Sequence, residues 1–212
     1  MSMRTFRRTA LAVTAAVLLP LALSACSEES TSNQGAAAPD AVSSPQPIGE
    51  TDTGAGGPFG TACASVPKSG AGSFEGMAQD PVATAASNNP ALSTLVAAVK
   101  KANLVDTLNN AQNITVFAPT NDAFAKIPKA DLDKVLADKE TLTKILTYHV
   151  VGEKLTPQQL GSGSFQTLQK GMITTKGSGT AYQVNDSSTV VCGNVPTANA
   201  TVYVVDTVLM PK

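Results

Sequence analysis

The chain has 212 residues, of which 42% are hydrophobic and 15% are charged. Its three arginines, Arg4, Arg7 and Arg8, all precede Cys26, so the chain from Cys26 onward carries twelve lysines against sixteen acidic residues, a net charge of −4. Arginine is the residue that proteins prefer for phosphate clamps and nucleic-acid grooves, and a mildly acidic chain without it is therefore not expected to bind nucleic acid.

The N-terminal segment is typical of a bacterial lipoprotein. An apolar run at 11–23 follows the arginines and is too short to cross a bilayer, which takes about 20 apolar residues in a helix. Residues 1–25 are therefore expected to be a signal peptide. The tetrapeptide Leu-Ser-Ala-Cys that ends at Cys26 looks like a lipoprotein box, in which the cysteine is lipidated and becomes the first mature residue. An ordinary secretory signal with a chance cysteine stays an alternative, and the export route, general secretory or twin-arginine, stays open.

Residues 26–60 are predicted to be a flexible tether that begins at the lipidated Cys26. They are rich in Ser, Thr, Gly, Ala and Pro, and such a segment cannot bury enough apolar surface to offset the entropy of ordering it. The remainder, 61–212, is predicted to be one domain with a core over about 73–211. The expected arrangement is a protein attached to the membrane by N-terminal acyl chains and facing the extracellular side or cell wall.

If Cys26 carries lipid, two cysteines remain, Cys63 and Cys192. An even pair in an oxidising, exported environment favours a disulfide, while two buried free thiols are the alternative. The chain has no CxxC or HExxH pattern and a single histidine, so no metal site and no cofactor are expected.

The first half of the predicted domain has helical patterns. Asp80-Pro81 and Asn89-Pro90 each pair a capping residue with a proline suited to the first helical position. Apolar residues at helical spacing follow Asn89-Pro90, and others follow Pro128. The expected helices are 82–86, about 90–101, a turn at 121–126, 128–136, and a helix from 138 or 141 to 148.

The second half has the period of β-strands. A β-branched and aromatic run at 114–117 predicts a strand that Pro119 ends, and short alternating segments separated by Gly and Asn/Asp turns follow Tyr148. Helices first and strands later, without strict alternation, indicate an α+β domain. The expected strands are 149–151, 164–169, 172–176, 180–184, 189–192 and 201–205, with a helical turn at 156–160 between the first two.

Three blocks of residues resemble fasciclin domains. The first spans 115–124, the second is Tyr148-His149-Val150-Val151, and the third spans 198–211. The first block includes the family's structural signature, here Thr115, Phe117, Pro119, Thr120, Asn121 and Phe124. Phe117 and Phe124 are expected to fill the core from the two sides of the turn at 118–120, and Thr120 and Asn121 to satisfy the amides left open at the helix start. With the lipoprotein signal, the tether and the two cysteines, the chain closely resembles the mycobacterial surface antigens of this family, and more the lipoprotein form than the soluble secreted form.

The resemblance implies a single fasciclin domain, a β-wedge or sandwich of short strands with several helices in the N-terminal half, and a Cys63–Cys192 disulfide. It also implies adhesion or contact with a host, through an integrin or a matrix protein. The acylated N-terminus would make the protein a candidate agonist of a Toll-like receptor as well, if the organism meets a host. In animal members of the family, integrin binding is attributed to the Tyr-His stretch, here Tyr148 and His149, and to an Asp-Ile motif. That second motif is missing, because Cys192-Gly193-Asn194-Val195-Pro196 stands in its place.

Two other functions are alternatives to adhesion. One is an envelope module that binds a lipid or glycan in a cleft between helices and sheet, without an adhesive role. An apolar groove lined by Leu, Val and Phe and open to solvent would favour it, and a filled core with no apolar pocket would oppose it. The other is an enzyme, for which His149 could supply a base. No Gly-x-Ser-x-Gly elbow is present, and a lone histidine at a helix-to-strand junction is typically structural, so the expected class is not an enzyme.

Overall fold

The computed structural model describes residues 56–211, and the predicted signal peptide, Cys26 and most of the tether lie outside them. The helices are two 3-10 turns, η1 (Thr61–Ser65) and η2 (Pro90–Leu92), and α1 (Phe74–Gln79), α2 (Val82–Ser87), α3 (Ser93–Lys101), α4 (Val105–Asn110), α5 (Asn121–Ala125), α6 (Lys129–Ala137), α7 (Lys139–Tyr148) and α8 (Pro157–Leu160). Within the described range, no helix is both long enough and apolar enough to cross a bilayer.

Seven strands form one sheet in the order β2-β1-β7-β6-β5-β4-β3. They are β1 (Ile114–Pro119), β2 (Val150–Val151), β3 (Ser162–Gln166), β4 (Met172–Ser178), β5 (Ala181–Val184), β6 (Ser188–Pro196) and β7 (Ala200–Val205). The central pair, β1 and β7, is parallel, and the other neighbouring strands are antiparallel.

The two ends of the sheet meet. Val151 of β2 forms a bridge with Thr167, just beyond β3, and the Leu168 amide donates a hydrogen bond to the Val150 carbonyl at 2.8 Å. β6 changes register twice, between Val190 and Cys192 and again before Val195, and such bulges let a strand bend. The bend carries β6 from the hairpins of β3–β5 into the central sheet, so the strands enclose a wedge.

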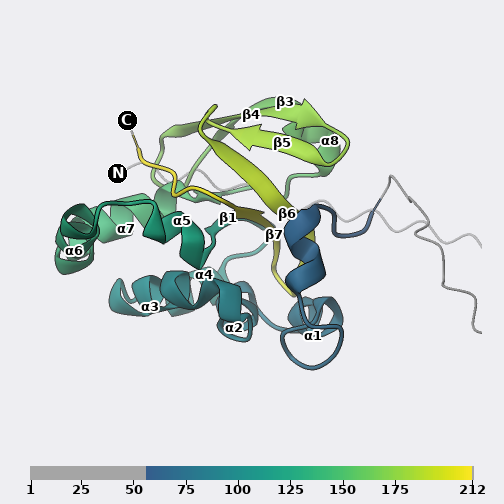
Figure 1. Ribbon diagram of the computed structural model, residues 1–212, viewed down its shortest axis with the longest axis horizontal. Coiled ribbons are helices and arrows are strands. Elements are labelled where there is room, and N and C mark those ends of the chain that lie inside the picture. The colour runs from purple at the N-terminus through teal and green to yellow at the C-terminus, as the bar shows by residue number, and fades with distance from the viewer. Residues whose placement is uncertain (1–55, 212) are drawn as a thin grey trace, which may run out of the picture. The chain divides into compact units, whose positions relative to one another are not determined.

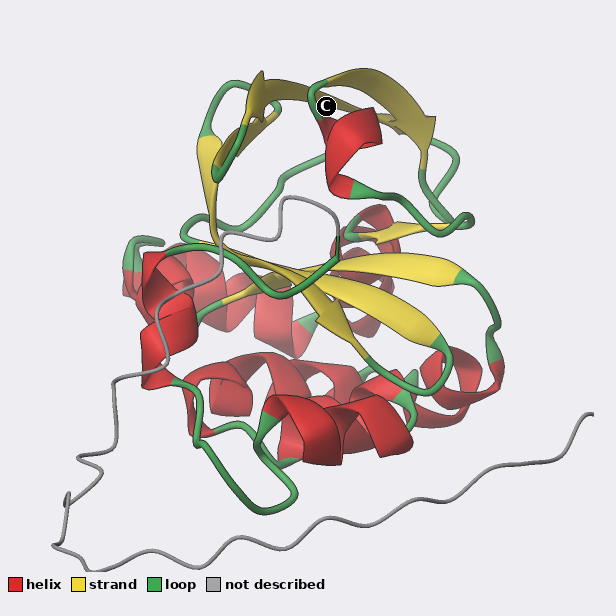
Figure 2. Cartoon of the chain, turned by 90° about the vertical axis from the view of Figure 1, so that its right-hand side faces the viewer, coloured by secondary structure: helices red, strands yellow, loops and turns green. Residues whose placement is uncertain are grey.

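β1 and β7 are buried along their whole length because both faces of this pair are covered (Figure 2). Val116 and Val202 pack toward the helices, in a core with residues of α2, α3 and α7. Their neighbours Phe117 and Tyr203 point the other way, into the wedge, and their rings stack with centroids 5.9 Å apart. In Figure 1, α2, α3 and α4 lie below this central pair and the hairpins β3–β5 lie above it.

The expected fold class is confirmed: the domain is a mixed α+β wedge of short strands with its helices concentrated in the N-terminal half. Two helices were not expected, α1 and α4. Ser73 caps α1, because its hydroxyl accepts the Gly76 amide at 3.1 Å. Serine is a preferred N-cap residue, so Ser73 could have predicted the start of α1. Asp80 does not cap α2 as predicted; the Val82 amide donates instead to the Asn199 side chain at 2.8 Å, across 117 residues of sequence.

The domain begins earlier than the predicted boundary at residue 61. Phe59 pairs with Gly193 through two backbone hydrogen bonds of 3.1 and 2.7 Å, and its ring lies 5.3 Å from that of Tyr182. Composition alone placed Phe59 in the tether, because its neighbours are small and polar. The Asn194 side chain also donates to the Gly56 carbonyl at 3.1 Å, so this segment is joined to the fold through both Phe59 and Asn194.

Candidate functional site

The first signature block begins with a buried polar residue that serves the fold. Thr115 is fully buried, and its hydroxyl donates to the Glu153 carbonyl and accepts from the Leu155 amide, both at 2.8 Å. These bonds fix the loop after β2 against β1. Thr115 satisfies two backbone groups that would otherwise be buried without partners, which is costly.

Phe117 and Phe124 pack in two separate cores. Phe117 lies in the wedge, while Phe124, on α5, lies in the core between helices and sheet. The intervening Pro119 is the last residue of β1 and is also buried. The prediction that the two rings fill opposite sides of the turn at 118–120 agrees with this arrangement.

Thr120 and Asn121 cap two different helices. The Thr120 hydroxyl accepts the Ala123 amide at 3.2 Å and so caps α5, as expected. Asn121 was expected to serve the same helix start, and this prediction is wrong. The side-chain oxygen of Asn121 accepts the Thr94 amide of α3 at 2.9 Å, and its side-chain nitrogen donates to the Pro90 carbonyl at 2.9 Å. The reason is tertiary, because α3 packs beside α5 and brings its open amides to Asn121.

Tyr148, at the end of α7, points into the fold and is 4% exposed. Its hydroxyl donates to the Met172 carbonyl at 2.8 Å and accepts from the Asn185 side chain at 2.9 Å. Met172 begins β4 and Asn185 follows β5, so Tyr148 holds the hairpin of the wedge to the helix. Both hydrogen bonds of the Tyr148 hydroxyl are therefore made within the domain.

His149, the chain's one histidine, is 2% exposed and connects two distant segments. Its Nε2 accepts the Leu209 amide at 2.9 Å, so the proton is on Nδ1, which donates to the Ile145 carbonyl at 2.8 Å. Burial lowers the pKa of His149 to about 4, against the weaker opposing effect of the Ile145 hydrogen bond. The ring is therefore neutral at pH 7 and both its nitrogens are occupied, which leaves no free base for acid–base chemistry.

The disulfide between Cys63 and Cys192 is present, with the two Cα atoms 4.9 Å apart. It joins η1 to β6 next to the Phe59–Gly193 bridge. A Cβ at Gly193 would lie 2.4 Å from the Phe59 ring, so only glycine fits beneath that side chain. Together these contacts form an N-terminal clamp, defined here as Phe59, Cys63, Cys192 and Gly193.

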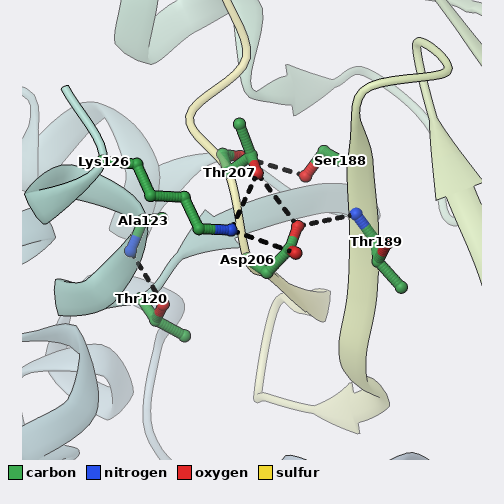
Figure 3. Close-up of polar contacts among 7 residues, drawn as sticks. All are labelled: Thr120, Ala123, Lys126, Ser188, Thr189, Asp206 and Thr207. Atoms are coloured by element: carbon green, nitrogen blue, oxygen red, sulfur yellow. Dashed lines mark hydrogen bonds and ion pairs between the residues drawn. The ribbon is translucent and has the colours of Figure 1, made fainter.

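A charged cluster that the sequence did not predict lies where β7 ends (Figure 3). One Asp206 oxygen accepts the Thr189 amide at 2.8 Å, and the other forms an ion pair with Lys126 Nζ at 3.2 Å. Partial burial acts to raise the pKa of Asp206, but the bonds from Thr189, Lys126 and Thr207 outweigh it and lower the pKa. The cluster joins α5, β6 and the closing segment. Both Asp206 oxygens and the Lys126 ammonium group are paired within it.

Two apolar cavities flank the central sheet on its helical side. The larger has a volume of about 60 Å³ and lies between β1 and β7 on one side and α2, α3 and α4 on the other. The smaller, about 20 Å³, lies beneath α6 and α7. Leu146 and His149 belong to the walls of both cavities. The larger cavity is apolar and lies between helices and sheet, where a ligand-binding module was expected to have its cleft.

The described residues hold no group of three or more His, Cys, Asp or Glu side chains that could bind a metal ion. Of the predicted site residues, the structure brings together Cys63 with Cys192, and it places Tyr148, His149 and the signature block in internal contacts. Cys26 lies outside the described range.

Known proteins and solved structures match this chain over most of the described domain. The "Fasciclin domain" family model matches residues 90–211. The chain is 49% identical over 160 residues to "Immunogenic protein MPB70" of Mycobacterium bovis, covering 73% of this chain and 81% of that protein. It is 53% identical over 147 residues to "Cell surface glycolipoprotein MPB83" of the same species, covering 67% and 66%.

A solved FAS1 domain pair from the insect cell adhesion molecule Fasciclin I has the same fold. It superposes with a TM-score of 0.52 at 22% identity, covering 64% of this chain and 52% of that one. The family match extends over more than half of the chain and includes all three blocks that carried the resemblance. The chain belongs to the fasciclin-domain family.

Proposed function

We propose that this protein is a non-catalytic, cell-surface binding module of the adhesion type, held at the membrane by acyl chains on Cys26. The observation that supports it most is the 53% identity to a protein named as a cell-surface glycolipoprotein, together with the match to the fasciclin family. The chain's lipoprotein-like N-terminus is consistent with the same location. The engagement of His149 on both nitrogens supports a role without catalysis.

The contact surface is proposed to lie outside the Tyr-His block. Tyr148 and His149 are buried and hydrogen-bonded within the domain, so neither side chain reaches a partner unless the fold opens. The Asp-Ile motif is also missing from this chain. Contact with an integrin or a matrix protein would therefore use exposed surface of the domain, whereas a Toll-like receptor would be engaged through the acylated N-terminus.

Vesicles carrying the purified full lipoprotein test adhesion in its anchored form. They are passed over surfaces coated with integrin, fibronectin, collagen or a Toll-like receptor ectodomain, with protein-free vesicles as the control. We expect retention on at least one surface, unchanged by Tyr148→Phe, which removes only the buried hydroxyl. Retention on none of them contradicts adhesion, and loss of retention in a folded Tyr148→Phe protein contradicts the proposed surface.

A second function, binding of an apolar ligand from the cell envelope, is favoured by one observation: the larger cavity between helices and sheet. Ligand sites in proteins are concave and largely apolar, and this cavity has both properties. The two functions are compatible, because adhesion would use the outer surface and the ligand would occupy the interior.

A further inference from the structure

We propose that the larger cavity binds the end of a single aliphatic chain of an envelope lipid, and not a glycan. The proposal rests on the second function above and is independent of adhesion. Its first support is the chemistry of the walls, which carry no Asp, Glu, Lys or Arg side chain. Phe117 contributes to them from β1 while its ring points into the wedge, and His149 is neutral. The other apolar walls are aliphatic, with Leu95, Val99, Val116 and Val202 facing one another across the cavity. Such walls suit methylene and methyl groups.

Most polar side-chain groups in the walls are already paired; the exceptions are the Thr107 hydroxyl, on an exposed residue, and the amide nitrogen of Asn89. The hydroxyls of Ser87, Thr147 and Thr197 donate to the carbonyls of Ala83, Thr143 and Ala200, at 2.7–3.0 Å. The side-chain oxygen of Asn89 accepts the Ala91 amide, and His149 uses both ring nitrogens. A sugar ring placed here would lose hydrogen bonds to water without gaining replacements, which is costly. An alkyl chain loses none.

The size of the cavity limits the occupant to a chain end. Its volume is about 60 Å³. Pockets that enclose a whole drug-sized ligand are about 300–1,000 Å³. The geometry thus fits a few carbon atoms at the tip of a chain, while the rest of the molecule extends outward.

An apolar residue of the wall reaches solvent. Leu168 lines the cavity and is 43% exposed, and its amide is fixed by the bond to the Val150 carbonyl. A chain that enters beside Leu168 keeps apolar contact from cavity to surface, and its polar headgroup stays in water. A protein tethered to a membrane through Cys26 would meet such chains at high local concentration.

Octyl glucoside tests the proposal because it joins an eight-carbon chain to a sugar, and glucose supplies the sugar alone. The oxidised full chain carrying Cys26→Ser is used, so that no acyl chain of its own competes, and methyl NMR spectra are recorded below the micelle concentration. We expect saturable shifts of the Leu95, Val99 and Val116 methyl groups, with nuclear Overhauser contacts to the octyl chain, and no shifts with glucose.

A matched pair of variants locates the site. Ala86→Leu adds volume at a half-buried wall position and is expected to weaken octyl glucoside binding at least about tenfold. Ala97→Leu makes the same change at an exposed position of α3 outside the walls and is expected to leave binding unchanged. If Ala86→Leu does not fold, the contacts observed in the parent protein decide the question.

Three results overturn the proposal. Equal binding of glucose and octyl glucoside would contradict the assignment of an aliphatic chain as the ligand. Ligand binding itself would then be kept, with a glycan as the ligand. Contacts to the methyl groups of the smaller cavity, such as those of Leu142, move the site. No binding of either compound overturns both the chain assignment and the second function, and it leaves adhesion untouched.

Discussion

Tyr148 and His149 show how a family motif can be functional for folding without being a contact surface. Each side chain bonds a segment far along the sequence, Tyr148 to Met172 and Asn185, and His149 to Leu209. His149 also forms part of the wall between the two cavities. The motif therefore joins helix α7, the wedge and the closing segment into one unit.

The neutral state of buried His149 predicts a loss of stability in mild acid. The unfolded chain takes up a proton at the ordinary histidine pKa of 6.5, whereas the folded chain does not until the pKa of about 4. The free energy of unfolding should be fully present above pH 6.5 and fall by about 1.4 kcal/mol per pH unit as the pH drops toward 4. Urea unfolding between pH 7.5 and 5, where carboxylates of ordinary pKa contribute little, measures this.

His149→Gln is the control for that measurement. With the only histidine removed, the chain should be less stable at pH 7.5, because a buried hydrogen bond is lost, yet nearly constant in stability between pH 6.5 and 5. A parent protein whose stability stays level over that interval would show that the ring is not held neutral.

At the scale of elements, side-chain caps connect helices to one another and not only to themselves. Asn121, at the start of α5, satisfies backbone groups of η2 and α3. Asn199, before β7, accepts the first amide of α2 and donates to carbonyls at the C-terminal end of α4, including that of Leu108 at 2.7 Å. Two asparagines thus hold the helical layer against the ends of the central strands.

Asn121→Ala should weaken the contact between α3 and α5. It leaves the part-buried Thr94 amide and the exposed Pro90 carbonyl without their partner, so we expect a loss of about 1–1.5 kcal/mol in the free energy of unfolding. Asp122→Asn, an exposed change in the next position, should shift it by less than about 0.5 kcal/mol. Equal effects of the two variants in urea titrations would contradict the bridging role.

Periodicity predicted the elements that have strong local signals, and it missed contacts that depend on distant partners. The strand at Ile114 and the helix before Tyr148 follow from residue type and spacing. The short helices α1 and α4 carry few apolar positions, so their pattern is weak and packing decides them. β6 extends beyond the predicted 189–192 because its bulges cannot be seen from alternation.

The candidate site was predictable in part. The signature residues and the cysteine pair could be named from the sequence, but the burial of Tyr148 and His149 depends on how β4 and the closing segment fold over them. The Lys126–Asp206 cluster joins residues 80 positions apart, and no local pattern marks such a pair.

For the whole molecule, the N-terminal clamp determines where the tether enters the domain. Phe59 pairs with Gly193 and lies beside Tyr182, and four residues later Cys63 is bonded to Cys192. If the chain is anchored through Cys26 as proposed, a force on that end would reach β6, next to β7 of the central pair, through the Phe59–Gly193 pairing. The clamp therefore suits a domain that is held from its N-terminal side.

Replacing both Cys63 and Cys192 by alanine should lower the free energy of unfolding by about 2–5 kcal/mol, because the bond closes a loop with a sequence separation of 129 residues. The measurement is urea unfolding of the variant beside the oxidised parent. Treating the parent with a reductant should give the same loss, and a reduced protein as stable as the oxidised one would contradict a stabilising role for the clamp.

The central claim is that this fasciclin domain works while tethered to a membrane through Cys26. Mass spectrometry of the N-terminal peptide from the mature, cell-derived protein tests it most directly, with the Cys26→Ser chain as the control. We predict a peptide that begins at Cys26 and carries at least two acyl chains, enough for stable anchoring. A peptide with an unmodified Cys26, or one cut at another residue, would contradict the claim.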